Sequence, residues 1–312
     1  MAFDPVTLAA SGTSFLTNKL SSSFDNDFLT SIWMSGSGIA ADGDGTGAQA
    51  GYLYFSTGNS DPCGCSYDEV NNIANSVVKI SPDLSTVVDI FTPSNESIMD
   101  KYDVDLGSGG VMKIPPQGAK FPSLLVAGGK DGRLFLLNTN NLGGYTPGGP
   151  NNVLGVVTQG GCWCAPSYFM GPEGIGRVVS SGGNTVITWK LINNGTSTLL
   201  TEEASATIQS PNSGQDPGFF TTVSSNGTGP NENAIIWAVT RPSGVNNTVY
   251  LYAINAVPLN GTLPLLGQYA AGQWNLTRDA NIKPVVANGQ VFVASDHMLT
   301  IFGLPLSDVG KR

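Results

Sequence analysis

Residues 123–138 read SLLVAGGKDGRLFLLN, two apolar runs on either side of Lys130-Asp131-Gly132. Asp-Gly is favoured in tight hairpin turns, because glycine takes a positive φ without steric cost. The runs are continuously apolar rather than alternating, which is typical of strands that are buried on both faces. We therefore predict a hairpin packed between neighbouring sheets, with Gly132 at positive φ.

The same arrangement of apolar runs and short polar turns recurs along the chain. The further segments are GYLYFSTG (51–58), NSVVKISP (75–82), TVVDIFTP (86–93), GRVVSSGG (176–183), TVITWKLI (185–192), AIIWAVTR (234–241), TVYLYAIN (248–255), QVFVAS (290–295) and LTIFGL (299–304). A glycine-rich segment with a short strand of its own precedes each unit, at 33–43, 106–116, 160–170, 218–227 and 282–289. Each unit therefore holds four short strands.

The spacing of the units predicts the fold class. The second long strands end at positions 57, 53, 63 and 49 residues apart, marked by Ile80, Leu137, Lys190, Ala253 and Phe302. Four strands per repeat of about 50 residues predict an all-β chain, a β-propeller of four-stranded blades with about five blades present. A β-sandwich would explain the strands but not the similarity between units.

The predicted blades fill one domain over residues 1–312. They occupy residues 31–100, 101–160, 161–210, 211–272 and 273–306, and residues 1–30 form the tail of an incomplete first blade.

Several segments resemble pyrroloquinoline-quinone-like (quinoprotein-type) β-propeller repeat proteins that bacteria export. They are KDGRLFLLNTNNLGG, GYLYFSTGNS, FTPSNESIMDKYDVDLGSGG and VANGQVFVASDHMLTIFGL, and the resemblance covers nearly the whole chain in order. It implies a ring of seven or eight blades, of which this chain would be the C-terminal part. The alternative is a closed five-bladed ring in which residues 9–16 pair with residues 299–304.

Composition limits the partners. The net charge is −9 with only 14 Lys and Arg residues, so nucleic acid and anionic membrane surfaces are disfavoured. No apolar run is long enough for a membrane span. Low charge with abundant Gly, Ser, Thr and Asn predicts an exported protein, extracellular or periplasmic, although residues 1–12 lack the basic start and apolar run of a signal peptide. Glycosylation motifs, permitted rather than required by such a composition, begin at Asn95, Asn194, Asn226, Asn246, Asn260 and Asn275.

The quinoprotein resemblance implies pyrroloquinoline quinone and Ca²⁺ as cofactors, but the residues depart from the enzyme pattern. The chain has five arginines, none in a recognisable quinone-site context, and it has no adjacent cysteines. A copper site built on imidazoles is excluded, because His297 is the only histidine.

Asp42 and Asp44, in Ala41-Asp42-Gly43-Asp44-Gly45, are a weak candidate for calcium binding. Calcium prefers clustered carboxylate oxygens, but the Glu that completes an EF-hand loop is missing. An ordinary turn between two strands of a blade is the favoured interpretation.

Four cysteines form two Cys-x-Cys pairs, Cys63/Cys65 and Cys162/Cys164. Zinc sites prefer two intervening residues, so disulfides are favoured over zinc in an exported protein, and the pairing stays open. A reactive redox pair is the alternative. We place Cys162 and Cys164 on the inner strand of a blade, where both sulfurs would lie on one face.

Asp103 and Asp105 precede a glycine-rich segment at the predicted mouth of the central channel. Paired carboxylates there could act as acid and base or bind an ion, while aspartates also cap turns by accepting backbone N–H bonds. We favour the capping role.

The sequence therefore predicts a non-catalytic propeller that binds a small molecule or a protein at its face. The alternative is a quinone-dependent alcohol or sugar dehydrogenase whose cofactor site lies partly in blades upstream.

Overall fold

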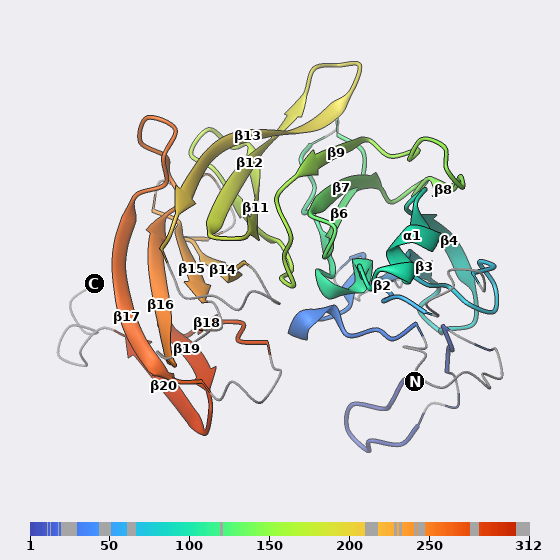
Figure 1. The fold of residues 1–312 in the computed structure, drawn as a ribbon, viewed down its shortest axis with the longest axis horizontal. Coiled ribbons are helices and arrows are strands. Elements are labelled where there is room, and N and C mark those ends of the chain that lie inside the picture. The colour runs from blue at the N-terminus through green and yellow to red at the C-terminus, as the bar shows by residue number, and fades with distance from the viewer. Residues whose placement is uncertain are drawn as a thin grey trace. The chain divides into compact units, whose positions relative to one another are not determined.

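The computed structural model describes residues 1–10, 12, 14–17, 19, 30–43, 51–60, 67–118, 121–209, 218–227, 230, 233–239, 242, 247–274 and 281–303. Its contacts divide the chain into two compact units. Unit 1 comprises Met1–Thr158 and Asn193–Leu199, and unit 2 comprises Gln159–Ile192 and Leu200–Arg312. Each unit is built from sheets of short strands that follow one another along the chain (Figure 1).

The first sheet of unit 1 begins as an antiparallel meander. Its order is β1-β2-β3-β4-β8, with β1 (Ala40–Ala41), β2 (Leu53–Ser56), β3 (Val77–Ile80), β4 (Val87–Thr92) and β8 (Gly144–Tyr145). The short β8 adds to the outer edge in parallel, pairing Phe91 with Gly144 and Thr92 with Tyr145. It comes from the following repeat.

The second sheet of unit 1 contains the hairpin predicted for residues 123–138. Its order is β5-β6-β7-β9, with β5 (Val111–Lys113), β6 (Leu124–Gly128), β7 (Arg133–Asn138) and β9 (Gly155–Thr158). Gly132 has φ 78, which confirms the predicted positive φ, whereas Asp131 keeps a negative φ. The turn is therefore a longer, type-I-based hairpin connection and not a two-residue one.

Unit 1 also contains the helical turns of the described residues. They are η1 (Met34–Gly36), α1 (Glu96–Lys101) and η2 (Leu106–Ser108). Asn95 stands at the N-terminal end of α1, and Glu96 and Lys101 place an acid and a base at the matching ends of the helix dipole.

Unit 2 has two complete four-stranded antiparallel sheets. The first has β10 (Ser167–Met170), β11 (Gly176–Gly182), β12 (Thr185–Asn193) and β13 (Thr198–Thr207) in sequence order. The second has β14 (Phe220–Ser224), β15 (Ile235–Val239), β16 (Thr248–Asn255) and β17 (Leu265–Gln273), whose long strands lie side by side in Figure 1. A third sheet has three described strands, β18 (Val285–Ala287), β19 (Gln290–Ser295) and β20 (Met298–Gly303).

The core consists of the apolar faces of successive sheets. In unit 1, Phe91 of β4 and Phe135 of β7 are fully buried with their ring centroids 5.0 Å apart. In unit 2, Phe219 packs edge-on against Tyr252 at 5.8 Å. Such aromatic pairs contribute about 0.5–1.5 kcal/mol beyond the area that they bury.

Glycines let the two sheets of unit 1 approach each other closely. A Cβ on Gly107 would lie 2.5 Å from the backbone nitrogen of Gly58, and a Cβ on Gly58 would lie 2.6 Å from Asp105 Oδ1. Within the second repeat, Gly109 packs against the backbone of Gly128, where a Cβ would collide with the carbonyl group. No side chain larger than hydrogen fits at these contacts.

The structure confirms the predicted all-β fold class, a β-propeller of about five mostly four-stranded antiparallel sheets. The single domain, its blade boundaries and the seven- or eight-bladed ring stay predictions. The alternative of a closed five-bladed ring, in which residues 9–16 would pair with residues 299–304, also stays a prediction. Near the N-terminus the described residues hold an isolated antiparallel bridge between Phe3 and Ala10.

One local prediction is wrong. Cys162 and Cys164 do not lie on an inner strand, because β10 begins only at Ser167. Gly160 at φ 89 turns the chain before the pair. Pro166 follows the pair and cannot donate a ladder hydrogen bond.

Candidate functional site

Asp103 and Asp105 lie on the turn between α1 and η2 and both contact Lys130 of the β6–β7 turn. Lys130 Nζ is 2.5 Å from Asp105 Oδ2 and 3.2 Å from Asp103 Oδ2. The two carboxylates differ in environment, since the Asp105 side chain is 4% exposed and that of Asp103 is 56% exposed. One ammonium group thus bridges a buried and an exposed carboxylate.

Asp105 also holds the neighbouring sheet in place. Its Oδ1 accepts the backbone N–H of Asn59 at 2.7 Å, and Asp103 Oδ1 accepts the Asn59 amide at 3.0 Å. Asn59 follows β2 in the first sheet, so these bonds join consecutive repeats. Asp105 thus bonds the backbone of a distant segment, and its side chain does not cap the adjacent helical turn, unlike the capping role that we favoured from the sequence.

The pKa of Asp105 also indicates a structural role for this residue. Burial raises the pKa of its carboxyl group, and the hydrogen bond and charge of Lys130 offset that effect only in part. Lys130 Nζ also lies 5.8 Å from the centroid of the Trp33 ring. A buried carboxylate that is bonded to an ammonium group and a backbone N–H is poorly placed to exchange a proton with a substrate or to bind Ca²⁺.

Two further buried acids, Glu96 and Asp100, were not among the sequence candidates. They lie four residues apart on α1 and are 1% and 2% exposed. Asp100 Oδ1 accepts the backbone N–H of Ser60 at 3.0 Å and the Asn75 amide at 2.7 Å. Their i, i+4 spacing becomes informative only once a helix is assumed at this place.

A second charged network lies in unit 2. Arg177 of β11 contacts Glu203 of β13 through two nitrogens, Nε at 3.0 Å and Nη2 at 2.7 Å. It also contacts Glu173 at 2.7 Å, which Lys190 of β12 approaches at the same distance. The hydrogen bonds from Arg177 and then Lys190 lower the pKa of Glu173 to about 2. The Arg177 side chain is 3% exposed, so this network ties three strands together inside the sheet.

Asp42 has partners other than an ion. Its Oδ2 accepts the Tyr54 hydroxyl at 2.6 Å and its Oδ1 lies 3.3 Å from Lys113 Nζ. Burial raises the pKa of Tyr54, and Asp42 raises it further, so the tyrosine remains a donor. These contacts favour the turn interpretation, while Asp44 lies outside the described residues.

The sulfur atoms of Cys162 and Cys164 are in direct contact, and their Cα atoms are 5.3 Å apart. Both residues are buried, and Gly218 packs against the sulfurs, since a Cβ there would collide with Cys162 Sγ. Cys63 and Cys65 lie outside the described residues. Within the described part of the chain, no three His, Cys, Asp or Glu side chains are grouped so that they could hold a metal ion.

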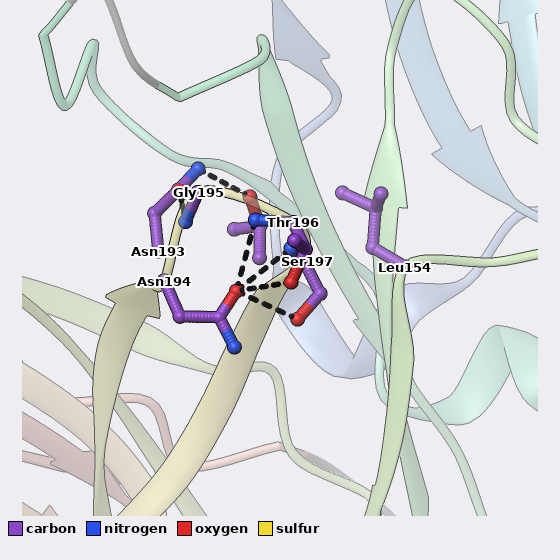
Figure 2. A pocket seen from close by; sticks show the side chains of 7 residues that line it. Leu154, Asn193, Asn194, Gly195, Thr196 and Ser197 are labelled. Carbon is purple, nitrogen blue, oxygen red and sulfur yellow. Dashed lines mark hydrogen bonds between the residues drawn. The ribbon is translucent and has the colours of Figure 1, made fainter.

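Among the described residues of unit 1, hollows open to a ligand lie at two places. One, of about 560 Å³, runs beside β4 and is lined by Phe15, Lys19, Glu69, Val70, Ile73 and residues 85–90. The other, of about 620 Å³, lies between Leu154 and the turn that joins β12 to β13, residues 193–198 (Figure 2). Both linings mix polar and apolar surface: polar surface somewhat exceeds apolar surface in the first, and apolar surface somewhat exceeds polar surface in the second. We call the first the β4 groove.

Across the described ranges, no helix is long and apolar enough to cross a membrane.

Comparisons with known proteins found likeness at the level of structure. No protein-family model matches the chain, and no curated protein matches its sequence. The chain is similar to BBS1N, solved in complex with ARL6DN, at 9% identity and TM-score 0.44, covering 86% of this chain and 65% of that one. It is similar to the β-propeller domain of Cps50 (Swd1) from Myceliophteria thermophila, at 12% identity and TM-score 0.38 over 75% of this chain and 68% of that one. A bifunctional GH43-CE protein from Bacteroides eggerthii is similar at 14% identity and TM-score 0.38, over 82% of this chain and 30% of that one. The chain thus spans less than two thirds of the length of the first of these structures.

Proposed function

We propose that this chain is a non-catalytic, quinoprotein-like β-propeller that binds a segment of a partner protein in the β4 groove. The β4 groove carries the proposal. It gathers apolar side chains from three parts of unit 1, namely Phe15, Val70 with Ile73, and the residues of β4. The quinoprotein-like type is supported by the resemblance of the quoted segments.

The exposure of the β4 groove favours a protein segment over a small molecule. Val70 is 59% exposed and Val88 is 43% exposed, so the apolar surface faces solvent. Small-molecule sites enclose about 70–90% of the surface of their ligand, which an open groove does not do. An open groove along β4 that combines exposed valines with polar and charged side chains instead suits an extended segment.

Charge indicates the character of the partner. Glu69 and Asp89 line the β4 groove together with a single base, Lys19, and the whole chain carries a net charge of −9. An apolar segment flanked by Lys or Arg would be attracted to this surface, and an acidic segment would be repelled.

The charged residues that sequence analysis selected fit a scaffold better than an active site. Lys130 and the Asn59 N–H occupy the Asp105 carboxylate, and Tyr54 and Lys113 contact Asp42. These residues do not fit the calcium ion that quinoprotein dehydrogenases use, because ammonium groups already lie on both carboxylates. We derive no catalytic step from them.

We also propose that the protein is exported. The low charge and the high Gly, Ser, Thr and Asn content support export, as does the contact between Cys162 and Cys164. A Cα separation of 5.3 Å suits a disulfide, and disulfides persist in oxidising compartments.

A peptide selection tests the β4 groove. A random peptide library displayed on phage is selected against the whole chain, and the affinity of an enriched peptide is measured by fluorescence polarisation. We expect apolar sequences flanked by Lys or Arg. Val88→Asp should weaken binding at least tenfold, because it places a charge on the apolar surface.

Val156→Asp is the matched control. Val156 lies on β9 and is 42% exposed, close to the 43% of Val88, but it does not line the β4 groove. Its substitution should change affinity less than twofold. Equal losses in the two variants, or no enriched peptide, would refute the β4 groove as a binding site. A shifted quinone absorption band with dye reduction after addition of the quinone and Ca²⁺ would refute the non-catalytic assignment.

A further inference from the structure

We propose that Asn194 is an N-glycosylation site, at which the turn between β12 and β13 presents the acceptor amide to a glycosyltransferase. The inference rests on the export proposed above and is independent of the β4 groove. Among the six Asn-x-Ser/Thr motifs, those at Asn95, Asn194 and Asn260 have all three residues described. The Asn194 and Asn95 motifs differ in geometry, and the difference favours Asn194 over Asn95; the Asn260 motif is exposed as well.

The turn holds the Asn194 side chain in one orientation. Asn194 Oδ1 accepts hydrogen bonds from Thr196 N at 3.1 Å, Thr196 Oγ1 at 2.9 Å, Ser197 N at 2.9 Å and Ser197 Oγ at 3.2 Å. Figure 2 shows the amide nitrogen on the side away from these four bonds. The donors thus fix the carbonyl oxygen and leave Nδ2 facing outward, with no hydrogen bond to the described residues.

The surroundings leave room for a large substituent. Asn194, Gly195 and Thr196 are all exposed at the tip of a two-stranded projection whose strands run nine and ten residues. Gly195 takes φ 90, which a side chain would disfavour, so the tight turn depends on glycine in the middle of the motif. A glycan at this tip replaces solvent and no packed side chain.

The Asn95 motif differs in both respects. Asn95 Oδ1 accepts Arg133 Nη2 at 2.6 Å, and the middle residue of the motif, Glu96, is 1% exposed. A glycan at Asn95 would lie against the folded core of unit 1. We therefore expect Asn95 to remain unmodified in the folded protein.

The chemistry requires a lipid-linked sugar pyrophosphate and its transferase in the export pathway. Nδ2 of Asn194 forms a bond to the anomeric carbon of the sugar, while the bond from that carbon to the pyrophosphate oxygen breaks. Nδ2 loses one proton, which passes to solvent, and the lipid pyrophosphate leaves with the electron pair of the broken bond. No oxidant or reductant is needed. The product is a bulky, solubilising group at the surface.

Site-resolved mass spectrometry tests the inference. The full chain is expressed behind a cleavable signal peptide in a eukaryotic secretory host. Glycans are then removed enzymatically in ¹⁸O water, which marks each formerly occupied asparagine. We expect the label on Asn194 and not on Asn95.

One threonine variant and one serine variant distinguish loss of the glycosylation motif from loss of turn stability. Thr196→Ala removes the motif and should abolish the label at Asn194. Ser197→Ala removes another hydroxyl that bonds the same Oδ1 but leaves the motif intact, so the label should persist. An unlabelled Asn194 in the secreted wild-type chain, or equal loss in both variants, would overturn the site. Either result would leave the β4 groove to be judged by peptide binding alone.

Discussion

Replacing Arg177 by methionine should destabilise unit 2 far more than the same replacement at Lys190. Arg177 is 3% exposed and forms a two-point contact with Glu203, which is itself 17% exposed. Removing one partner of a buried ion pair costs about 3–5 kcal/mol, because the other charge is left buried. Lys190 stays 4.0 Å from Glu203 and compensates in part, so we expect about 3 kcal/mol for Arg177→Met.

Lys190→Met is the matched control in the same network. Lys190 is 27% exposed and its nearest partner, Glu173, is 45% exposed, so solvent screens the pair. Exposed pairs contribute about 0–1 kcal/mol, which is the loss we expect here. Urea unfolding followed by tryptophan fluorescence reports on the unfolding of this sheet, because Trp189 lies beside Lys190 on β12. Equal losses of unfolding free energy in the two variants would refute the inference that the buried contact between Arg177 and Glu203 supplies the stability.

Acid should reduce the difference between wild type and Arg177→Met. Arg177 and Lys190 lower the pKa of Glu173 from its ordinary 4.5 to about 2. The stability from a lowered carboxyl pKa is fully present above pH 4.5 and is lost as the pH falls towards 2. The wild type therefore loses the whole of this contribution on acidification, while the variant loses only the smaller part that Lys190 supplies. A difference that stays constant from pH 6 to pH 2.5 would contradict this explanation.

Two glycine substitutions test the backbone geometry by thermal unfolding. Gly132→Val should cost about 1–3 kcal/mol, because valine is strained at φ 78, and Gly132→Asn should cost less; an unchanged melting temperature in the valine variant would mean that the turn was wrongly assigned. Gly107→Ala should cost about 1–3 kcal/mol by overpacking against Gly58, whereas Gly38→Ala, with open space around it, should change stability by a few tenths of a kcal/mol. A tolerated Gly107→Ala would show that the two sheets can separate freely.

The strands were predictable because their signal is local. The run at 248–255 coincides with β16 and the run at 290–295 with β19, since each is an uninterrupted apolar stretch between turn residues. The six-residue α1 is too short to display a helical period, and the two-residue β8 carries no pattern of its own. Cys162 was misplaced because alternation was assumed to continue past Gly160.

The partners of the predicted site residues were not predictable in this way. Asp105 was selected from its place before a glycine-rich segment, but Asn59 and Lys130 are distant in sequence and come from two different sheets. Nothing in the local pattern joins them, because their contact depends on how two repeats pack. The same holds for the β4 groove, which combines Phe15, Val70 and Val88 from separate segments.

Duplication or exchange of repeats in this chain must preserve the close contact between two sheets at Gly58 and Gly107. The two glycines belong to neighbouring sheets, and each leaves space for the backbone or a bonded side chain of the other sheet. A transplanted repeat with a sound core of its own would still be held away from its neighbour by a single methyl group at either position. Recombination in this part of the chain should therefore move two adjacent repeats together, so that the close contact between Gly58 and Gly107 is kept.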